Sequence, residues 1–192
     1  MAPQVNQQAV GNHTSPMIPS DILRYITEWT SHHGDSTSSR IGLERIGEEL
    51  KKCCDETLDT SLFPPARPGE EILYELAVDS QGGPSLYLVS DGVGVSSPPH
   101  EHQTWAVIVG IRGREFNVIY RPAPELGQRC ALVVSECIVG PGDVFAMLPG
   151  EIHGIDDTRG IHPTYHIHLY GCPLSSLPRL ESRLYIPHAR PE

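Results

Sequence analysis

Two histidines in the middle of the chain have the spacing of a metal-binding pair. His100 and His102 are separated by one residue at the start of an apolar run, in the segment GVSSPPHEH (94–102). In a β-strand, residues two apart point to the same face, so both imidazoles can reach one ion. The pair alone is a weak signal, because histidines on one strand face are often surface residues. A denser cluster, IHPTYHIHLYG (161–171), either binds a metal itself or serves one bound elsewhere.

The second half of the chain supplies a segment that strengthens the metal interpretation. PGDVFAMLPGEIHGI (141–155) begins with a tight turn and places His153 three residues after Gly150. Together with GVSSPPHEH, it resembles the two sequence motifs of the cupin superfamily, over roughly residues 90–170. The resemblance implies an all-β fold, a cupin jelly-roll barrel, with a metal held by His100, His102 and His153.

This implied ligand set contains no carboxylate. The glutamate that is usual in the first cupin motif is absent, because Ala106 and Val107 stand at its expected positions. Three neutral imidazoles suit a divalent transition metal such as iron, zinc, nickel or copper, and do not suit magnesium or calcium. They also leave coordination positions open for a substrate, as a catalytic site requires.

Two further segments resemble the thiol dioxygenases among the three-histidine cupins. PPHEHQTW (98–105) is similar to the PPH-x-H-x-TW run of bacterial 3-mercaptopropionate dioxygenases, and HIHLY (166–170) falls where that family has Ser-x-His-x-Tyr. The resemblance implies Fe(2+) as the cofactor and places Tyr170 and His168 beside the metal as catalytic residues. His166 stands in the position of the family serine, and because residues two apart on a strand share a face, we expect it on the same face as His168 and Tyr170. It also implies that Arg179 binds the substrate carboxylate, with Arg183 in reserve.

The same resemblance implies an activity but leaves the substrate open. The activity is addition of both atoms of O2 to the sulfur of a small carboxylate thiol, 3-mercaptopropionate-like or cysteine, to give a sulfinate in sulfur metabolism. The cysteine and arginine typical of animal cysteine dioxygenases would fall at Val107 and near Tyr74, so the match is to the bacterial branch. The alternatives are another three-histidine cupin dioxygenase or lyase acting on a different small molecule, or a non-enzymatic cupin that binds a small ligand.

The elements that must position these residues can be predicted from periodicity and turns. Ser20 and Asp21 are expected to cap a first helix. Apolar residues at helical spacing predict two helices within about residues 20–56, and the second has Ile41, Leu43, Ile46 and Leu50 as its apolar residues. From about 70 to 172, short apolar runs alternate with Gly and Pro turns, which indicates an antiparallel barrel. We therefore expect a flexible or extended arm over 1–18 and a single cupin domain over 19–192. Residues 173–192 form its C-terminal tail.

Composition excludes several other classes of protein. The formal charge is −10 and no basic stretch stands out, so we expect no nucleic-acid partner. No apolar run approaches the length of a membrane span. The five cysteines are odd in number and include no Cys-x-x-Cys pair, which favours reduced thiols and a cytoplasmic location. We expect a monomer or small homo-oligomer whose partners are a small-molecule thiol and O2.

Overall fold

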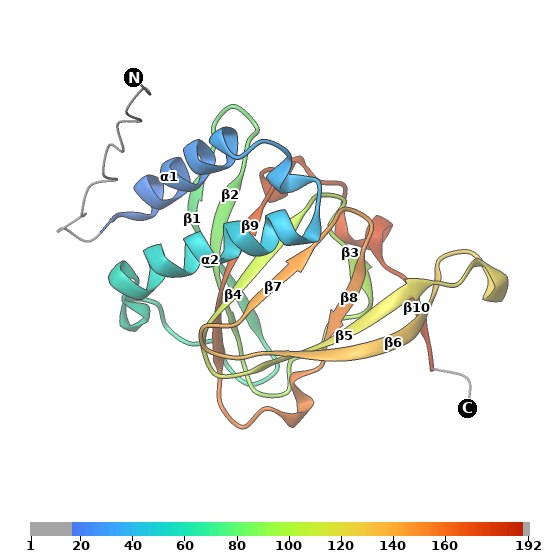
Figure 1. Ribbon diagram of the computed structural model, residues 1–192. Coiled ribbons are helices and arrows are strands. Elements are labelled where there is room, and N and C mark those ends of the chain that lie inside the picture. Colours follow the sequence, from blue (N-terminus) through green and yellow to red (C-terminus); the bar gives the residue numbers. More distant parts are fainter. Residues whose placement is uncertain (1–16, 190–192) are drawn as a thin grey trace, which may run out of the picture.

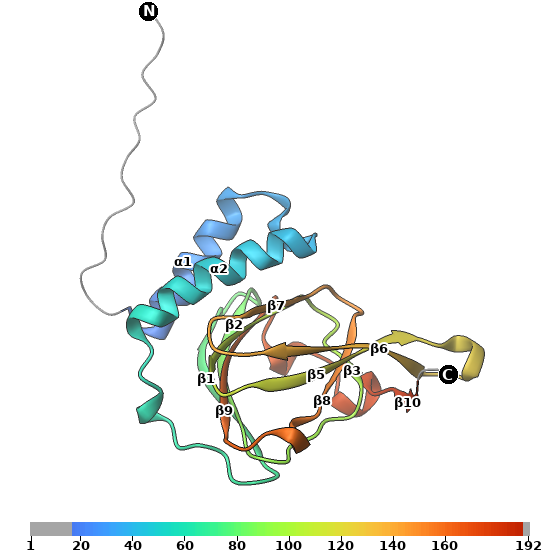
Figure 2. The same ribbon diagram turned by 60° about the horizontal axis from the view of Figure 1, so that its bottom comes forward.

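The computed structural model describes residues 17–189 and consists of a β-barrel with two helices laid over one side (Figures 1 and 2). The helices are α1 (Pro19–His32) and α2 (Arg40–Thr57). Within the described range the strands are β1 (Glu71–Val78), β2 (Ser85–Asp91), β3 (His100–Glu101), β4 (Ala106–Arg112), β5 (Glu115–Pro122), β6 (Cys130–Val139), β7 (Val144–Met147), β8 (Ile152–Ile155), β9 (Thr164–Tyr170) and β10 (Ile186–His188).

The strands form two sheets that curl toward each other into the barrel. One sheet has the order β1-β2-β9-β4-β7 and the other has the order β10-β6-β5-β8-β3. Their strand pairs are antiparallel, apart from the parallel pair of β10 and β6. The cupin-type jelly roll with two N-terminal covering helices, predicted from the motifs and turn spacing, is therefore confirmed.

Both predicted helices are present, but the first begins differently from the expectation. Ser20 and Asp21 were expected to cap it, whereas the N-cap is Ile18, with Pro19 in the first helical position and no side-chain capping bond. A backbone N–H in the first helical position has no partner within the helix. Proline suits that position because it has no N–H. The second helix has a side-chain cap, since the hydroxyl of Ser39 accepts a hydrogen bond from the backbone N–H of Gly42 at 3.2 Å.

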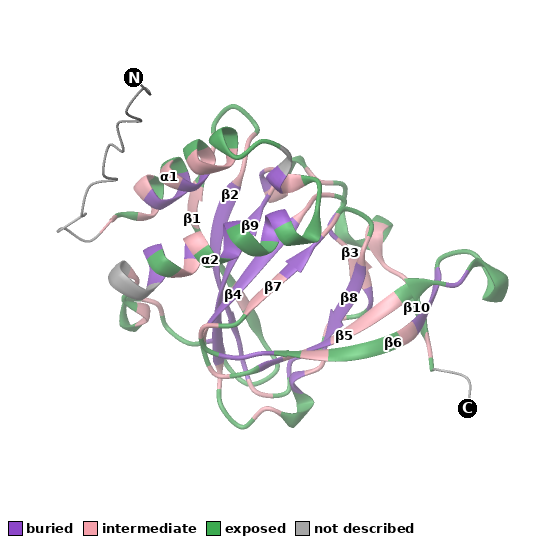
Figure 3. Cartoon of the chain, viewed as in Figure 1, coloured by how far each residue is buried: buried purple, intermediate pink, exposed green. Residues whose placement is uncertain are grey.

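The main apolar core lies between the helices and the outer face of the first sheet. Leu43, Ile46 and Leu50 of α2 are completely buried against residues of β2, β4 and β9, and Figure 3 shows the buried side of both helices turned to the barrel. Ile41 was grouped with these residues in the sequence interpretation, and that is wrong. It is 65% exposed, because at 3.6 residues per turn it lies about 140–200° around α2 from Leu43, Ile46 and Leu50, on the face turned away from the sheet.

Strand β9 is buried on both faces, and this arrangement positions the histidine cluster. Tyr165, Ile167 and Leu169 belong to the core beneath the helices. Side chains alternate along a strand, so His166, His168 and Tyr170 point the other way, into the barrel. The segment IHPTYHIHLYG thus has one face that packs in the apolar core and one face that points its histidines and Tyr170 into the barrel.

Three short strands, β3, β8 and β10, were not recognised in the sequence as separate elements. The tail also returns to the barrel, where Ile186–His188 pairs with β6 and a 3-10 turn at Leu180–Arg183 precedes it. The predicted arm (1–18) falls almost entirely outside the described residues. Of the helices in the described part of the chain, none has the length and apolar character needed to cross a membrane.

Candidate metal centre

The three histidines of the two motif segments meet at one end of the barrel. His100 on β3 lies directly opposite His153 on β8 in the antiparallel pair, and His102 follows one residue after β3. Nε2 of His102 lies 3.2 Å from Nε2 of His100 and 3.2 Å from Nε2 of His153. Metal–nitrogen bonds of about 2.0–2.1 Å at angles of roughly 90–110° put ligand nitrogens about 3.0–3.4 Å apart. The three imidazoles therefore fit one metal ion.

Hydrogen bonds fix which ring nitrogen of two of these histidines faces the others. Nδ1 of His100 lies 3.0 Å from the carbonyl oxygen of Pro98, and Nδ1 of His153 lies 2.8 Å from Oδ1 of Asn117. Both oxygens only accept, so both Nδ1 atoms carry the proton and donate it. Nε2 of each ring is then left with its lone pair free, which is the form that binds a metal.

Burial keeps these histidines neutral. Desolvation lowers the pKa of His100, and it lowers the pKa values of His102 and His153 well below the ordinary value, with the neighbouring imidazoles adding to the effect. His102 and His153 are 6% and 2% exposed. Neutral imidazoles without a nearby ligand carboxylate match the set expected for a divalent transition metal.

Two buried polar residues of β5 support His153, and the sequence interpretation missed both. Asn117 accepts the proton of His153 through Oδ1 and donates through Nδ2 to Oε1 of Glu115 at 2.6 Å. Glu115 and Asn117 are fully buried. The only signal in the sequence was two polar residues at alternate positions in an otherwise apolar strand. The line Glu115–Asn117–His153 orients the imidazole, as outer partners of metal ligands commonly do.

The metal centre opens into a cavity of about 170 Å³. Its chemically active lining consists of His100, His102, His153, His168, Tyr170 and Arg183. Apolar side chains from β1, β2, β8 and the tail form most of the remaining wall, together with the polar residues Glu71 and Ser97. The cavity therefore combines a metal-binding face, a phenol, a guanidinium and one carboxyl group in a largely apolar wall.

Tyr170 and His168 form a hydrogen-bonded pair beside the metal centre. The hydroxyl oxygen of Tyr170 lies 2.9 Å from Nδ1 of His168. The rings of Tyr170 and His102 meet edge to face with centroids 5.2 Å apart. Desolvation raises the pKa of Tyr170, with nearby carboxylates adding to the rise, so its hydroxyl keeps its proton at neutral pH. This placement agrees with the neighbourhood expected for both residues from the resemblance.

The two arginines named as carboxylate binders lie in different surroundings. Arg179 is exposed at the start of the tail's 3-10 turn and is not part of the cavity lining. Arg183, one turn later, is half-buried and lines the cavity. Its Nη1 donates to the carbonyl oxygen of Glu101 at 2.9 Å, and its Nε donates to that of Pro178 at 3.0 Å. The reserve residue is thus the arginine that the structure brings to the histidines.

His166 lies deeper than the cavity. It is fully buried, it is not in the cavity lining, and its Nδ1 is 3.3 Å from Oε2 of Glu115. His162, near the start of the same segment, is exposed in a turn and lies outside the site. The segment therefore holds one exposed histidine, one beside the metal centre and one beneath it.

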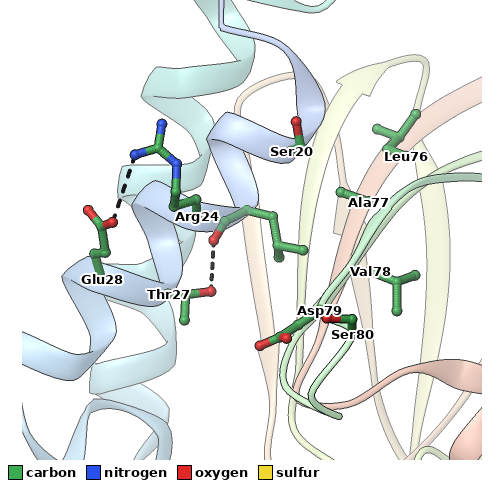
Figure 4. Close-up of a pocket in the computed structure, with 10 residues that line it drawn as sticks. Ser20, Arg24, Thr27, Glu28, Leu76, Ala77, Val78, Asp79 and Ser80 are labelled. Carbon is green, nitrogen blue, oxygen red and sulfur yellow. Dashed lines mark hydrogen bonds and ion pairs between the residues drawn. The ribbon is translucent and has the colours of Figure 1, made fainter.

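A larger cavity, of about 440 Å³, lies elsewhere, between α1 and the β1–β2 hairpin (Figure 4). Three of its polar side chains have partners within α1: Arg24 pairs with Glu28 at 3.9 Å, and the hydroxyl of Thr27 donates to the carbonyl oxygen of Leu23 at 2.8 Å. None of the metal-ligand clusters found in the described residues lies there. We therefore assign the chemistry to the smaller cavity.

No family model matches this chain. Similar solved structures include a cupin-superfamily protein of Desulfitobacterium hafniense, at 16% identity over 61% of this chain and 91% of that chain, with a TM-score of 0.45. The polyketide cyclase RemF of Streptomyces resistomycificus matches at 22% identity over 56% of this chain and 70% of its own, with a TM-score of 0.42. An oxalate oxidase matches at 16% identity over 60% of this chain and 59% of its own, with a TM-score of 0.45. Each alignment covers less than two thirds of this chain.

Proposed function

We propose that this protein is an iron(II)-dependent thiol dioxygenase that converts a small carboxylate thiol into its sulfinate. The observation that carries the proposal is the cavity lining, in which a group of three imidazoles with no carboxylate among its members faces the same space as Tyr170, Arg183 and Glu71. A thiol that carries a carboxylate has two groups to be bound. The three-histidine metal site is suited to its sulfur, and Arg183 is suited to its carboxylate.

The reaction adds both oxygen atoms of O2 to the substrate sulfur, so that RSH and O2 become RSO2H. Sulfur loses four electrons and O2 gains them, and no other reductant is needed. Iron(II), when bound by the three histidines, supplies the redox chemistry that activates O2 and a positive charge that favours thiolate over thiol. Because His100, His102 and His153 are neutral, they leave that charge undiminished for an anionic substrate.

Tyr170 holds a proton at the edge of the reacting space. Its hydroxyl stays protonated at neutral pH and is fixed by Nδ1 of His168. When Nδ1 donates to the phenol oxygen, the hydroxyl hydrogen is free to point into the cavity and donate to the substrate or to oxygen. The pair thereby orients the reactants and stabilises negative charge beside the metal.

Arg183 supplies the carboxylate-binding group in this proposal. Two of its five N–H groups donate to backbone carbonyl oxygens, which hold the guanidinium in place. The remaining N–H groups are available to a substrate carboxylate, for which a planar fork of donors is well suited. Leu174 and Leu180 of the tail form apolar wall beside it, which strengthens the interaction by excluding water.

A second candidate function is that of another three-histidine dioxygenase or lyase acting on a different small molecule. The observation in its favour is His166, which replaces the serine hydroxyl of the family that this chain resembles. An imidazole next to a buried carboxylate changes the charge and the hydrogen-bonding capacity beneath Tyr170 and His168. That change leaves the metal chemistry possible and makes the substrate the open question.

The test is to load the protein anaerobically with iron(II) and expose it to air with single thiols. The panel comprises 3-mercaptopropionate, cysteine, mercaptosuccinate and cysteamine, with O2 uptake and sulfinate formation measured together. We expect at least one carboxylate thiol to give stoichiometric uptake and product. If the iron-loaded protein consumes no O2 with any of them, the thiol assignment is wrong and the second candidate replaces it.

The two tail arginines form a matched pair for testing the substrate-binding part. Arg183→Ala should raise the KM for the active carboxylate thiol at least tenfold and leave that for cysteamine, which has no carboxylate, nearly unchanged. Arg179→Ala should change neither, because its side chain is exposed away from the cavity. An equal rise for both thiols in Arg183→Ala would remove the carboxylate-binding role.

A further inference from the structure

Beneath the metal centre lies a second group of potential ligands, which we call the deep cluster: Glu115, His166 and His168. One ligand atom from each of them falls within 4.8 Å of the others. Their exposed fractions are 0%, 0% and 4%, so the group is shielded from bulk solvent except where His168 borders the cavity. The deep cluster shares no residue with the three histidines assigned above.

The barrel brings the deep cluster together from both sheets. His166 and His168 are alternate residues of β9 in the first sheet, and Glu115 begins β5 in the second. The closest measured approach is 3.3 Å, between Nδ1 of His166 and Oε2 of Glu115. Such a separation is typical of two ligands that share one metal ion.

Most of the ligand atoms in the deep cluster have no partner. Oε2 of Glu115, both ring nitrogens of His166 and Nε2 of His168 are buried without a hydrogen bond. Buried polar atoms are nearly always paired, so an unpaired group usually marks an absent ion or water. An ion pair between Glu115 and protonated His166 would still leave both Nε2 atoms unmatched.

Two of the three ligands of the deep cluster, Glu115 and His168, are also held by their other polar atom. Oε1 of Glu115 accepts from Nδ2 of Asn117 at 2.6 Å, which leaves Oε2 for the cluster. Nδ1 of His168 is engaged by the hydroxyl of Tyr170 at 2.9 Å, which leaves Nε2. Pre-positioned ligands with fixed outer partners are the usual construction of a protein metal site.

We infer that the deep cluster is a second metal site, which takes a divalent transition ion such as zinc, manganese, cobalt or iron. Two imidazoles and one carboxylate are the donor types such ions prefer. Desolvation and the neighbouring carboxylates of Glu115 and Glu71 raise the pKa of Asp91 to about 9, which shows how unfavourable negative charge is in this part of the barrel. A cation in the deep cluster offsets that charge. The inference does not depend on the thiol assignment.

An ion in the deep cluster also acts on the cavity through His168. Binding at Nε2 forces the imidazole proton onto Nδ1, so that Nδ1 donates to the oxygen of Tyr170. The hydroxyl hydrogen of Tyr170 is then released toward the cavity. Occupancy of the deep cluster thereby sets the direction of a hydrogen bond beside the three-histidine centre, without contact between the two ions.

The test is a count of bound metal, with zinc(II) alone as the probe and no activity measurement. The full chain, stripped of metal and titrated with zinc(II), is expected to bind two equivalents. His166→Ser removes a deep-cluster ligand and should bind one, and His102→Ala removes a ligand of the other centre and should also bind one. His32→Ser, the same substitution at an exposed position, should still bind two.

Glu115→Gln provides a second route to the answer if His166→Ser fails to fold, because it preserves the size and the acceptor for Asn117. It should weaken binding of one equivalent at least tenfold. Cobalt(II) loaded into His102→Ala should give visible absorption bands that Glu115→Gln in the same background abolishes. A wild-type protein that binds a single equivalent lost in His102→Ala refutes the second site. So does a second equivalent that survives both deep-cluster substitutions, because it would then belong to the surface.

Discussion

Asn117→Ala should weaken metal binding at the three-histidine centre although Asn117 touches no metal. The substitution removes the acceptor that lies 2.8 Å from Nδ1 of His153 and frees the ring to rotate or change tautomer. Loss of such an outer partner typically lowers metal affinity about 10–100-fold, which is about 1.4–2.7 kcal/mol. It also leaves the buried Oε1 of Glu115 without its hydrogen-bond donor, which should lower the free energy of unfolding by about 1–3 kcal/mol.

The affinity is measured by competition with a chelator of known affinity, and the stability of the metal-free protein by denaturant unfolding. Asn117→Asp separates the two effects, because it keeps the acceptor for His153 but places a second carboxylate against Glu115. It should bind metal more tightly than Asn117→Ala while being less stable than wild type. Gln103→Ala, an amide removed from an exposed position beside His102, serves as the control and should change neither quantity. A folded Asn117→Ala that binds metal as tightly as wild type would refute the orienting role.

Four further outcomes follow from the burial and charge of particular groups. The metal-free protein should lose stability as the pH falls below about 6.5, because the three buried histidines have lowered pKa values and only the unfolded chain takes up their protons; denaturant midpoints across pH 5–8 measure this. Asp91, with its pKa raised to about 9 from 3.8, has the opposite sign, so Asp91→Asn should gain stability relative to wild type as pH rises within that window, by up to about 1.4 kcal/mol per pH unit; an equal effect at pH 5 and pH 8 would contradict this. Ile46→Ala should cost about 2–5 kcal/mol and Ile41→Ala less than about 0.5 kcal/mol in thermal or chemical unfolding. Tyr170→Phe should slow turnover at least tenfold with metal content unchanged, and loss of the metal itself would count against its proposed role.

The sequence was informative wherever a local pattern determines the outcome. Turn residues and short apolar runs predicted the strands, and the period-2 alternation of β9 predicted that His166, His168 and Tyr170 share a face. The cupin motifs led to three histidines whose Nε2 atoms the structure brings together. Each of these predictions depends on residues close in sequence or on a motif whose spacing carries the geometry.

The remaining features depend on contacts between distant segments, which no local pattern encodes. Arg179 and Arg183 differ by one turn of a tail that packs on β3 and the loop before it, and only that packing decides which of them reaches the cavity. Asn117 reaches His153 across the pairing of β5 with β8, and Glu115 reaches His166 only because the two sheets close on each other. The error at Ile41 is of another kind, because helical periodicity already places this residue on the face opposite Leu43, Ile46 and Leu50.

The two-faced burial of β9 makes the N-terminal helices a distant determinant of the chemistry. A shift of the strand by one residue would turn Ile167 and Leu169 into the barrel and press the histidines against apolar helices. The packing of α1 and α2 on the outer face favours the observed register, because it buries Ile167 and Leu169. Substitutions in α1 or α2 that loosen this packing should therefore weaken metal binding at the three-histidine centre. In a chain that lacks residues 19–57, β9 should no longer keep a single register, even where the barrel itself still forms.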